Sequence, residues 1–381
     1  MEFDFDTPVN RRGTHSLKWD VAEGELPMWV ADMDWPCAPC VREALQRKLD
    51  TGVYGYQIVP AAFGAAVADW WRTRHGWSVD PDSVIFCTGV VPAVTTCVQC
   101  LTNVGDNVVL LTPVYDIFFH SVQNMGRHVM AVPLLYDGRY DVDWEGLERA
   151  LAHPNTTMMI VCNPHNPTGQ VWSREELARM AALCRTHGVT VLSDEIHCDL
   201  TMPHVDYVPY GTVDGGAVVC VSAGKAFNLA GLQGAAVIVQ DLHLRRRVER
   251  ALNAHEVAEP NVLAVEGTVA ALTQGGPWLD ALRAYLAANR DRVTETLAER
   301  LPMVHVVPQQ ATYLMWLDVS AVAADSGPLC AHIRRRTGLW VTAGGQYAGN
   351  GAGFIRLNIA CPRALLEDGL RRLVEGIRTF A

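Results

Sequence analysis

Six short runs of apolar residues between positions 84 and 240 limit what this chain can fold into. Each run has four or five residues and is apolar on both faces; they cover 84–87, 108–111, 158–162, 189–192, 217–221 and 235–239. Amphipathic stretches with helical periodicity alternate with these runs. Strands of a parallel sheet are covered by helices on both sides, so they show continuous apolar runs of this kind. The pattern predicts an α/β fold with a large, mostly parallel sheet.

The pattern changes after residue 275. A long helical stretch over 279–301 precedes alternating strands near 303–307, 313–317, 339–342 and 354–359, and an amphipathic helix over 363–378 ends the chain. These features predict a smaller α+β domain. The irregular first 45 residues, rich in Trp and Pro, are expected to pack with it. We therefore expect an N-terminal segment over 1–45, a large domain over 46–275 and a small domain over 276–381.

The charge balance argues against several kinds of partner. The chain has 31 Lys and Arg against 41 Asp and Glu, a formal charge of -10, whereas nucleic acids and anionic membranes favour basic surfaces. No apolar stretch approaches the ~20 residues needed to cross a bilayer. The acidic N-terminus lacks the basic and apolar regions of a signal peptide. We expect a soluble, cytoplasmic protein that acts on a small molecule and binds neither nucleic acid nor membrane.

The cysteines raise the question of a metal site. Two C-x-x-C pairs occur among 11 cysteines, Cys37 with Cys40 and Cys97 with Cys100. The gap between the pairs is far longer than in a zinc ribbon, and no pair of histidines completes a finger. The odd count also disfavours a full disulfide framework. We expect no metal, and reduced, mostly buried thiols.

Polar residues follow four of the predicted strands directly. They are Thr88, Gly89 and Val90 after the first run, Asn163 to Gly169 (NPHNPTG) after the third, Asp194, Glu195 and His197 after the fourth, and Ser222 and Lys225 after the fifth. In open α/β sheets, ligands bind at the carboxyl ends of the strands. We therefore expect these side chains to meet at one edge of the sheet.

This combination fits the needs of pyridoxal phosphate. A lysine forms the Schiff base, a carboxylate keeps the pyridine nitrogen protonated, and a strand–turn–helix junction holds the phosphate. Each feature also has an ordinary structural explanation, because loop lysines are commonly solvated and a strand-end Asp often caps a helix. Their order and placement together favour the cofactor.

Nine motifs give the chain a family resemblance that runs from about residue 28 to 375. It resembles fold-type I pyridoxal-phosphate enzymes of the class I/II aminotransferase superfamily, and within it the cystathionine β-lyase (cysteine-S-conjugate lyase) branch. The motifs are WVADMDW at 29–35, GVYGY at 52–56, GVVPA at 89–93, TPVY at 112–115, CNPHNPTG at 162–169, SDEIH at 193–197, KAFNLAGLQ at 225–233, ATYLMWLD at 311–318 and IRLNIACPR at 355–363. The resemblance implies an aspartate aminotransferase-like fold and a homodimer with shared active sites.

The resemblance also implies a role for each matching residue. It makes Lys225 the Schiff-base lysine and the group that moves the Cα proton, and Asp194 the partner of the pyridine nitrogen. Substrate would be bound by Arg356, which takes the α-carboxylate, and by Ala31. The remaining cofactor contacts implied are Asn166 and His197 near the ring 3-oxygen, Tyr115 stacked on the ring, Gly89, Val90 and Ser222 at the phosphate, and Tyr56 at the phosphate of the neighbouring subunit.

Three positions depart from the family pattern. Gly224 and Ala226 stand beside the lysine where hydroxyl residues are usual, and Gln233 stands where aminotransferases commonly carry a phosphate-binding Arg. Gln233, and His197 in place of the usual Tyr, favour a lyase that releases a thiol, pyruvate and ammonia from cystathionine or a related cysteine S-conjugate. An aminotransferase is the alternative. A non-catalytic regulatory protein of the same fold ranks last, because the catalytic set is complete.

Overall fold

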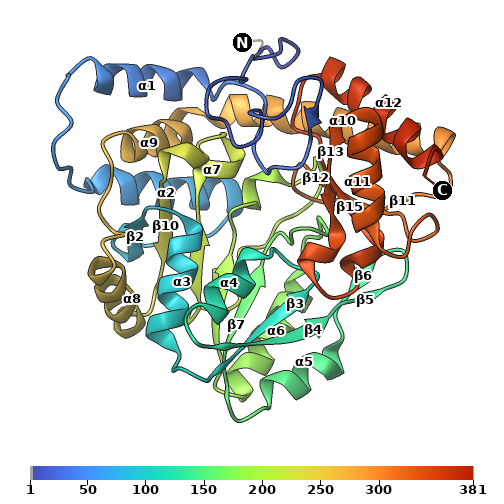
Figure 1. Ribbon diagram of the computed structural model, residues 1–381. Helices are drawn as coiled ribbons and strands as arrows, with labels where there is room; N and C mark the ends of the chain where they lie inside the picture. The colour runs from blue at the N-terminus through green and yellow to red at the C-terminus, as the bar shows by residue number, and fades with distance from the viewer. Residues whose placement is uncertain (1–2, 381) are drawn as a thin grey trace.

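The structure is a computed structural model that describes residues 3–380, and its largest element is a seven-stranded sheet (Figure 1). The strand order is β2 (Val84–Cys87), β10 (Ala235–Ile238), β9 (Val218–Val221), β8 (Thr190–Asp194), β7 (Thr156–Cys162), β3 (Asn107–Thr112) and β4 (His128–Pro133). All six predicted runs are strands of this sheet. Neighbouring strands are parallel from β9 to β4, whereas β10 runs antiparallel to both β2 and β9.

Alternate side chains of each strand enter two different cores. Val108 and Leu110 pack with α3 (Val90–Leu101), α4 (Ile117–Gln123) and α8 (Leu242–Ala254). Val109 and Leu111 pack on the opposite face, with α2 (Ala61–His75), α5 (Trp144–Leu151) and α6 (Arg174–Thr186). Successive side chains of a strand point to opposite faces, so a strand covered on both sides must be apolar throughout. The two cores explain the continuous apolar runs.

The chain after residue 275 forms a separate sheet with its own helices. α10 (Gly276–Arg300) leads into the antiparallel order β11 (His305–Val306), β12 (Leu314–Asp318), β15 (Phe354–Asn358) and β14 (Thr342–Ala343), and α11 (Ser326–Thr337) and α12 (Arg363–Arg378) complete the unit. The single strand expected over 339–342 is instead two short ones. β13 (Leu339–Trp340) pairs with β1 (Leu26–Pro27), and β14 pairs with β15.

The N-terminal residues lie beside the C-terminal elements, as the dark-blue and red parts of Figure 1 show. Phe5, Trp35 and Trp278 share one core with the sheet of β12 and β15. A buried ion pair, Lys18 Nζ to Asp34 Oδ2 at 2.9 Å, holds the loop that follows β1. The pairing of β1 with β13 places the N-terminal segment against the C-terminal part of the chain. The domain boundaries expected at residues 45 and 275 stay a prediction.

The remaining elements connect these parts. They are α1 (Pro39–Leu49), α7 (Ala223–Ala226), α9 (Ala264–Gln274), the short hairpin of β5 (Leu135–Tyr136) and β6 (Tyr140–Asp141), and six 3-10 turns, η1 (Pro81–Ser83), η2 (Cys198–Leu200), η3 (Tyr210–Thr212), η4 (Ala230–Leu232), η5 (Gly344–Tyr347) and η6 (Gly351–Gly353). Within residues 3–380, no helix combines the length and the apolar character needed to cross a membrane.

Candidate active site

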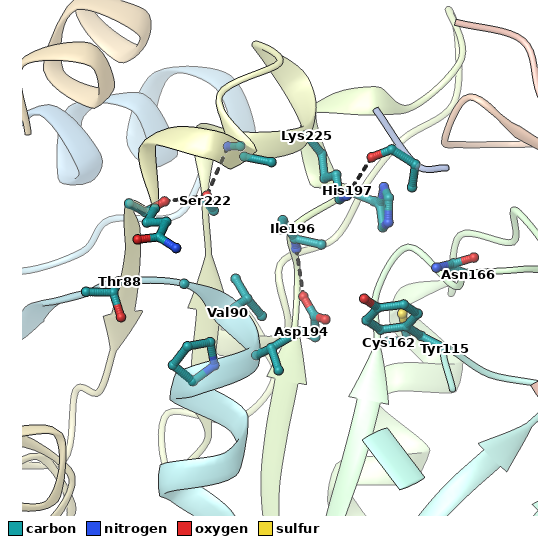
Figure 2. A pocket seen from close by; sticks show the side chains of 18 residues that line it. Thr88, Val90, Tyr115, Cys162, Asn166, Asp194, Ile196, His197, Ser222 and Lys225 are labelled. Atoms are coloured by element: carbon teal, nitrogen blue, oxygen red, sulfur yellow. Dashed lines mark hydrogen bonds between the residues drawn. The ribbon is translucent and has the colours of Figure 1, made fainter. Parts of the chain in front are cut away.

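A cavity of about 230 Å³ lies where the strands of the large sheet end. Nine of the eleven residues to which the family resemblance gave a site role line it: Ala31, Gly89, Val90, Tyr115, Asn166, Asp194, His197, Ser222 and Lys225. Figure 2 shows Thr88 and Ser222 at one side, Tyr115 and Asn166 at the other, and Asp194 and His197 between them. The carboxyl ends of neighbouring strands therefore bring together residues more than 100 positions apart in the chain.

Lys225 extends into this cavity from the short helix α7. Its Nζ donates a hydrogen bond to the carbonyl oxygen of Ala31 at 2.7 Å. Burial, together with the positive charge of Arg356, lowers the pKa of the Lys225 amine to about 8. A lysine with this pKa is uncharged in about one molecule in ten at pH 7, so it is available as a nucleophile and as a base.

Asp194 is the last residue of β8 and is only 4% exposed. Its Oδ1 accepts a hydrogen bond from the backbone N–H of Ile196 at 3.0 Å. Burial raises the pKa of this carboxyl to about 7, against the lowering effect of the Ile196 hydrogen bond. Because burial disfavours the ionised form of Asp194, a cationic N–H that enters the cavity would stabilise that form.

Arg356, on β15, is not among the residues that line the cavity, but its guanidinium contacts the lining residue Asn166. Its Nη1 donates to Asn166 Oδ1 at 3.2 Å and its Nη2 donates to the Trp29 carbonyl at 3.0 Å. Burial, together with the positive charges of Lys225 and Arg356, lowers the pKa of His197 to about 3, so the imidazole is neutral. Among the described residues, Arg356 Nε and His197 Nδ1 have no hydrogen-bond partner. Such buried, unsatisfied polar atoms at a cavity indicate a ligand that completes them.

The opposite end of the cavity suits an anion. Gly89 is the N-cap residue of α3, and because it has no side chain, it makes no side-chain hydrogen bond to the free N–H groups of the first turn. Free N–H groups and the helix dipole at such an end favour a phosphate. Thr88, Ser222 and Gln233 line this end, and no Arg is among the described residues lining the cavity.

Gly224 fits this end because of its small size. The hydroxyl of Ser222 accepts from the Gly224 N–H at 2.9 Å and donates to the Gly234 carbonyl at 2.6 Å. A Cβ at position 224 would lie 3.0 Å from Ser222 Oγ and 3.6 Å from the Ala230 Cα. A larger residue at position 224 would therefore require the Ser222 side chain to shift slightly.

The segment over 29–33 closes the other side of the cavity with its backbone. Each of its five carbonyl groups accepts a hydrogen bond from a side chain. The donors are Arg356 and Thr342 to Trp29, Asn358 to Val30 and Asp32, Lys225 and Tyr313 to Ala31, Lys18 to Asp32, and Arg11 and Asn228 to Met33. Asn358 stands two residues after Arg356 on β15, so both face the segment. The sequence pattern offered this spacing, but the roles of Asn358 and Tyr313 were not predicted from it.

Of the predicted site residues, Arg356 and Tyr56 lie outside the cavity lining, whereas the others line it. Tyr115 forms part of the cavity wall, its ring 5.6 Å from that of Phe118, and burial raises the pKa of its phenol to about 12. Tyr56 lies outside the cavity of its own chain, on the loop between α1 and α2, with its side chain fully exposed. That loop projects from the body of the molecule in Figure 1.

Comparison with known proteins gives one consistent family. The model "Aminotransferase class I and II" matches residues 26–373. The chain is 41% identical to cystathionine beta-lyase PatB of Bacillus subtilis over 97% of this chain and 98% of the relative. It is 36% identical to protein MalY of Escherichia coli over 99% of both chains. The crystal structure of cystalysin from Treponema denticola, which contains a pyridoxal 5'-phosphate cofactor, superposes with a TM-score of 0.96 at 29% identity, covering 100% of both chains. The chain belongs to the aminotransferase class I and II family, as its motifs predict.

Proposed function

We propose that the protein is a pyridoxal-phosphate-dependent C–S β-lyase that cleaves cystathionine or a related cysteine S-conjugate to a thiol, pyruvate and ammonia. The observation that carries the proposal is the meeting of Lys225, Asp194 and the N-terminus of α3 in one cavity. The predictions of cofactor and enzyme class are confirmed by relatives named as cystathionine β-lyase and by neighbours solved with pyridoxal phosphate.

The residues present fit the cofactor at every side. Lys225 Nζ would bind its aldehyde, Asp194 its ring nitrogen, and the first turn of α3 with Ser222 its phosphate. Tyr115, Asn166 and His197 would surround the ring. When bound, pyridoxal phosphate supplies an electron sink that accepts the pair left when the Cα–H bond breaks.

The chain's own side chains then carry the remaining steps. The Arg356 guanidinium would bind the substrate α-carboxylate through two parallel hydrogen bonds, a geometry that a lysine does not offer. Lys225 Nζ would take the Cα proton, since its lowered pKa leaves a usable fraction as the free amine. The leaving sulfur needs no strong acid, because a thiol of pKa ~8.5 departs readily as its thiolate.

The test is incubation of the cofactor-loaded protein with L-cystathionine and with other cysteine thioethers. Pyruvate and free thiol formed without a keto-acid acceptor are expected. Product that forms only when an acceptor is added would contradict the lyase and favour an aminotransferase, which the breadth of the matched family also includes.

A second test addresses the lysine. Lys225→Ala should lose the visible absorbance that pyridoxal phosphate acquires on covalent attachment to an amine. Lys48→Ala is the matched control, because Lys48 lies on α1, outside the cavity lining, and donates only to Gln57. Unchanged absorbance in Lys225→Ala would contradict the assignment.

We further propose a homodimer in which Tyr56 of one protomer contacts the phosphate held by the other. The loop over 51–60 exposes five apolar or aromatic side chains, at Val53 71%, Tyr54 58%, Tyr56 105%, Ile58 83% and Val59 38%. Such a cluster marks an interaction surface. Mixing Tyr56→Ala and Lys225→Ala subunits should restore one normal site per mixed dimer; no recovery of activity over the separate variants would contradict shared sites.

We propose that the protein works in the cytoplasm. All eleven cysteines are unpaired, and most of them are buried. Unpaired thiols in this number suit a reducing compartment. Fractionation of the native organism, with activity followed against L-cystathionine, tests the location.

A further inference from the structure

Glu195 is a fully buried carboxylate that the proposed chemistry does not use. It directly follows Asp194 at the end of β8, and its side chain is 0% exposed. It does not line the cavity, because successive residues there point to opposite sides. A buried acid next to the predicted cofactor carboxylate needs an explanation, since burying a charge without partners is very costly.

Four donors surround the Glu195 carboxylate. Oε1 accepts from Ser193 Oγ at 2.8 Å, from the Tyr210 backbone N–H at 2.8 Å and from Asn163 Nδ2 at 3.4 Å. Oε2 accepts from the Tyr207 hydroxyl. Burial raises the pKa of Glu195, whereas the four hydrogen bonds lower it; the backbone N–H and Asn163 Nδ2 can only donate, so these partners favour the ionised carboxylate.

These contacts join the two turns that carry cofactor-binding residues. Asn163 opens the NPHNPTG turn that holds Asn166, and its backbone N–H donates to the Asp194 carbonyl at 2.9 Å. The same residue's side chain donates to Glu195. Glu195 therefore fixes the ends of β7 and β8 relative to each other.

The charge of Glu195 also acts on Asp194. The titratable groups that face Glu195 are Asp194 on its own strand, Cys220 on β9, Cys198 on η2, and Tyr207 and Tyr210 from the following loop. None of these side chains is a cation. Two like charges at neighbouring positions disfavour each other's ionised form. A cationic N–H beside Asp194 relieves that repulsion.

We propose that Glu195 is a positioning residue for the cofactor: its buried carboxylate aligns the turns that carry Asp194 and Asn166, and its negative charge strengthens the hold of Asp194 on the protonated ring nitrogen. The inference rests on the proposed function, because it requires pyridoxal phosphate in the cavity. The family resemblance implied no role for Glu195, the second acidic residue of the SDEIH motif, and this inference assigns it one.

The test is a pH titration of the visible absorbance of the cofactor-loaded protein. Glu195→Gln keeps the shape of the side chain and an oxygen for the three donors on Oε1, but removes the charge. Cations near position 195 then lose a stabilising anion, so the protonation midpoint should move down by about one pH unit. Glu195→Asp keeps the charge and should keep the midpoint of the unaltered protein.

Asp199→Asn is the matched control. Asp199 is another buried carboxylate of the same region, which accepts from Trp70 Nε1 at 3.0 Å and from His75 Nε2 at 2.9 Å, and it lies outside the cavity lining. Its substitution should lower thermal stability without moving the midpoint. A midpoint that Glu195→Gln leaves unchanged, or that Glu195→Asp moves equally far, would overturn the proposal.

The outcomes separate this proposal from the proposed function. If the unaltered protein takes up no pyridoxal phosphate, both fail. If it takes up the cofactor, but the protonation midpoint does not depend on the charge at position 195, only the proposed role of Glu195 fails. If Glu195→Gln does not fold, the Glu195→Asp titration decides, because a downward shift there contradicts a role of the charge.

Discussion

Asp194→Asn should stabilise the cofactor-free protein at neutral pH while removing its function. Burial raises the pKa of Asp194 from its ordinary 3.8 to about 7. A group whose pKa is raised on folding holds its proton more tightly in the folded state, so ionisation works against folding. The penalty is absent near pH 4, grows as the pH rises, and is complete above about pH 7.

The size of the effect follows from the same pKa. At ~1.4 kcal/mol for each factor of ten in the proton equilibrium, ionising Asp194 costs the folded chain about 4 kcal/mol. Asparagine avoids this cost and can still accept from the Ile196 N–H, but its amide needs a partner of its own. We therefore expect a gain of about 2 to 4 kcal/mol in the free energy of unfolding at pH 8.

The assay is urea unfolding of both cofactor-free proteins between pH 4.5 and pH 8. The difference between them should grow with pH. Asp199→Asn provides a contrast of opposite sign, because hydrogen bonds and charge from His75 outweigh burial and lower the pKa of Asp199. That variant should lose stability at pH 8. A gain from Asp194→Asn that is the same at pH 4.5 and pH 8, or a loss at pH 8, would refute the reasoning.

Three further substitutions test the site and its support. Arg356→Lys should raise KM for an amino-acid substrate about 30-fold or more with a smaller change in kcat, since one of two charge-assisted hydrogen bonds is lost; steady-state kinetics measure it. Lys18→Met should lower the free energy of unfolding by about 2–4 kcal/mol in urea, because it leaves Asp34 buried without its closest cation. Asn358→Ala should cost about 2–3 kcal/mol in the same assay and also raise KM, because two carbonyls of segment 30–32 each lose one of their donors. Unchanged KM in Asn358→Ala would show that the segment is irrelevant to substrate binding.

The large sheet could be predicted because its strands are buried on both faces. β4 was missed although residues 129–132 are apolar; it lies at the edge of the sheet, and most of its side chains remain partly or fully exposed. The reversed direction of β10 was not anticipated either. An apolar run contains no information on strand direction, and only its antiparallel pairing with β2 and β9 reveals it.

The cavity could be predicted for a related reason. Parallel strands end at the same edge, so the residues after each strand must meet there, and nine of the expected residues line the cavity. The support from Asn358 and Tyr313 was not predicted, because both act on backbone carbonyls of a segment almost 300 residues away. Every residue has a backbone carbonyl, so the sequence does not indicate which carbonyls accept hydrogen bonds from distant side chains.

The hydrogen bonds of segment 29–33 have a consequence for changing the enzyme's specificity. The segment is held in place through its backbone carbonyl groups, and the side chains of Val30 and Ala31 take no part in these hydrogen bonds. Only Ala31 of this segment lines the cavity, so replacing its side chain would alter the cavity wall and leave the main-chain hydrogen bonds in place. A library at position 31 is a rational starting point for admitting bulkier thioethers.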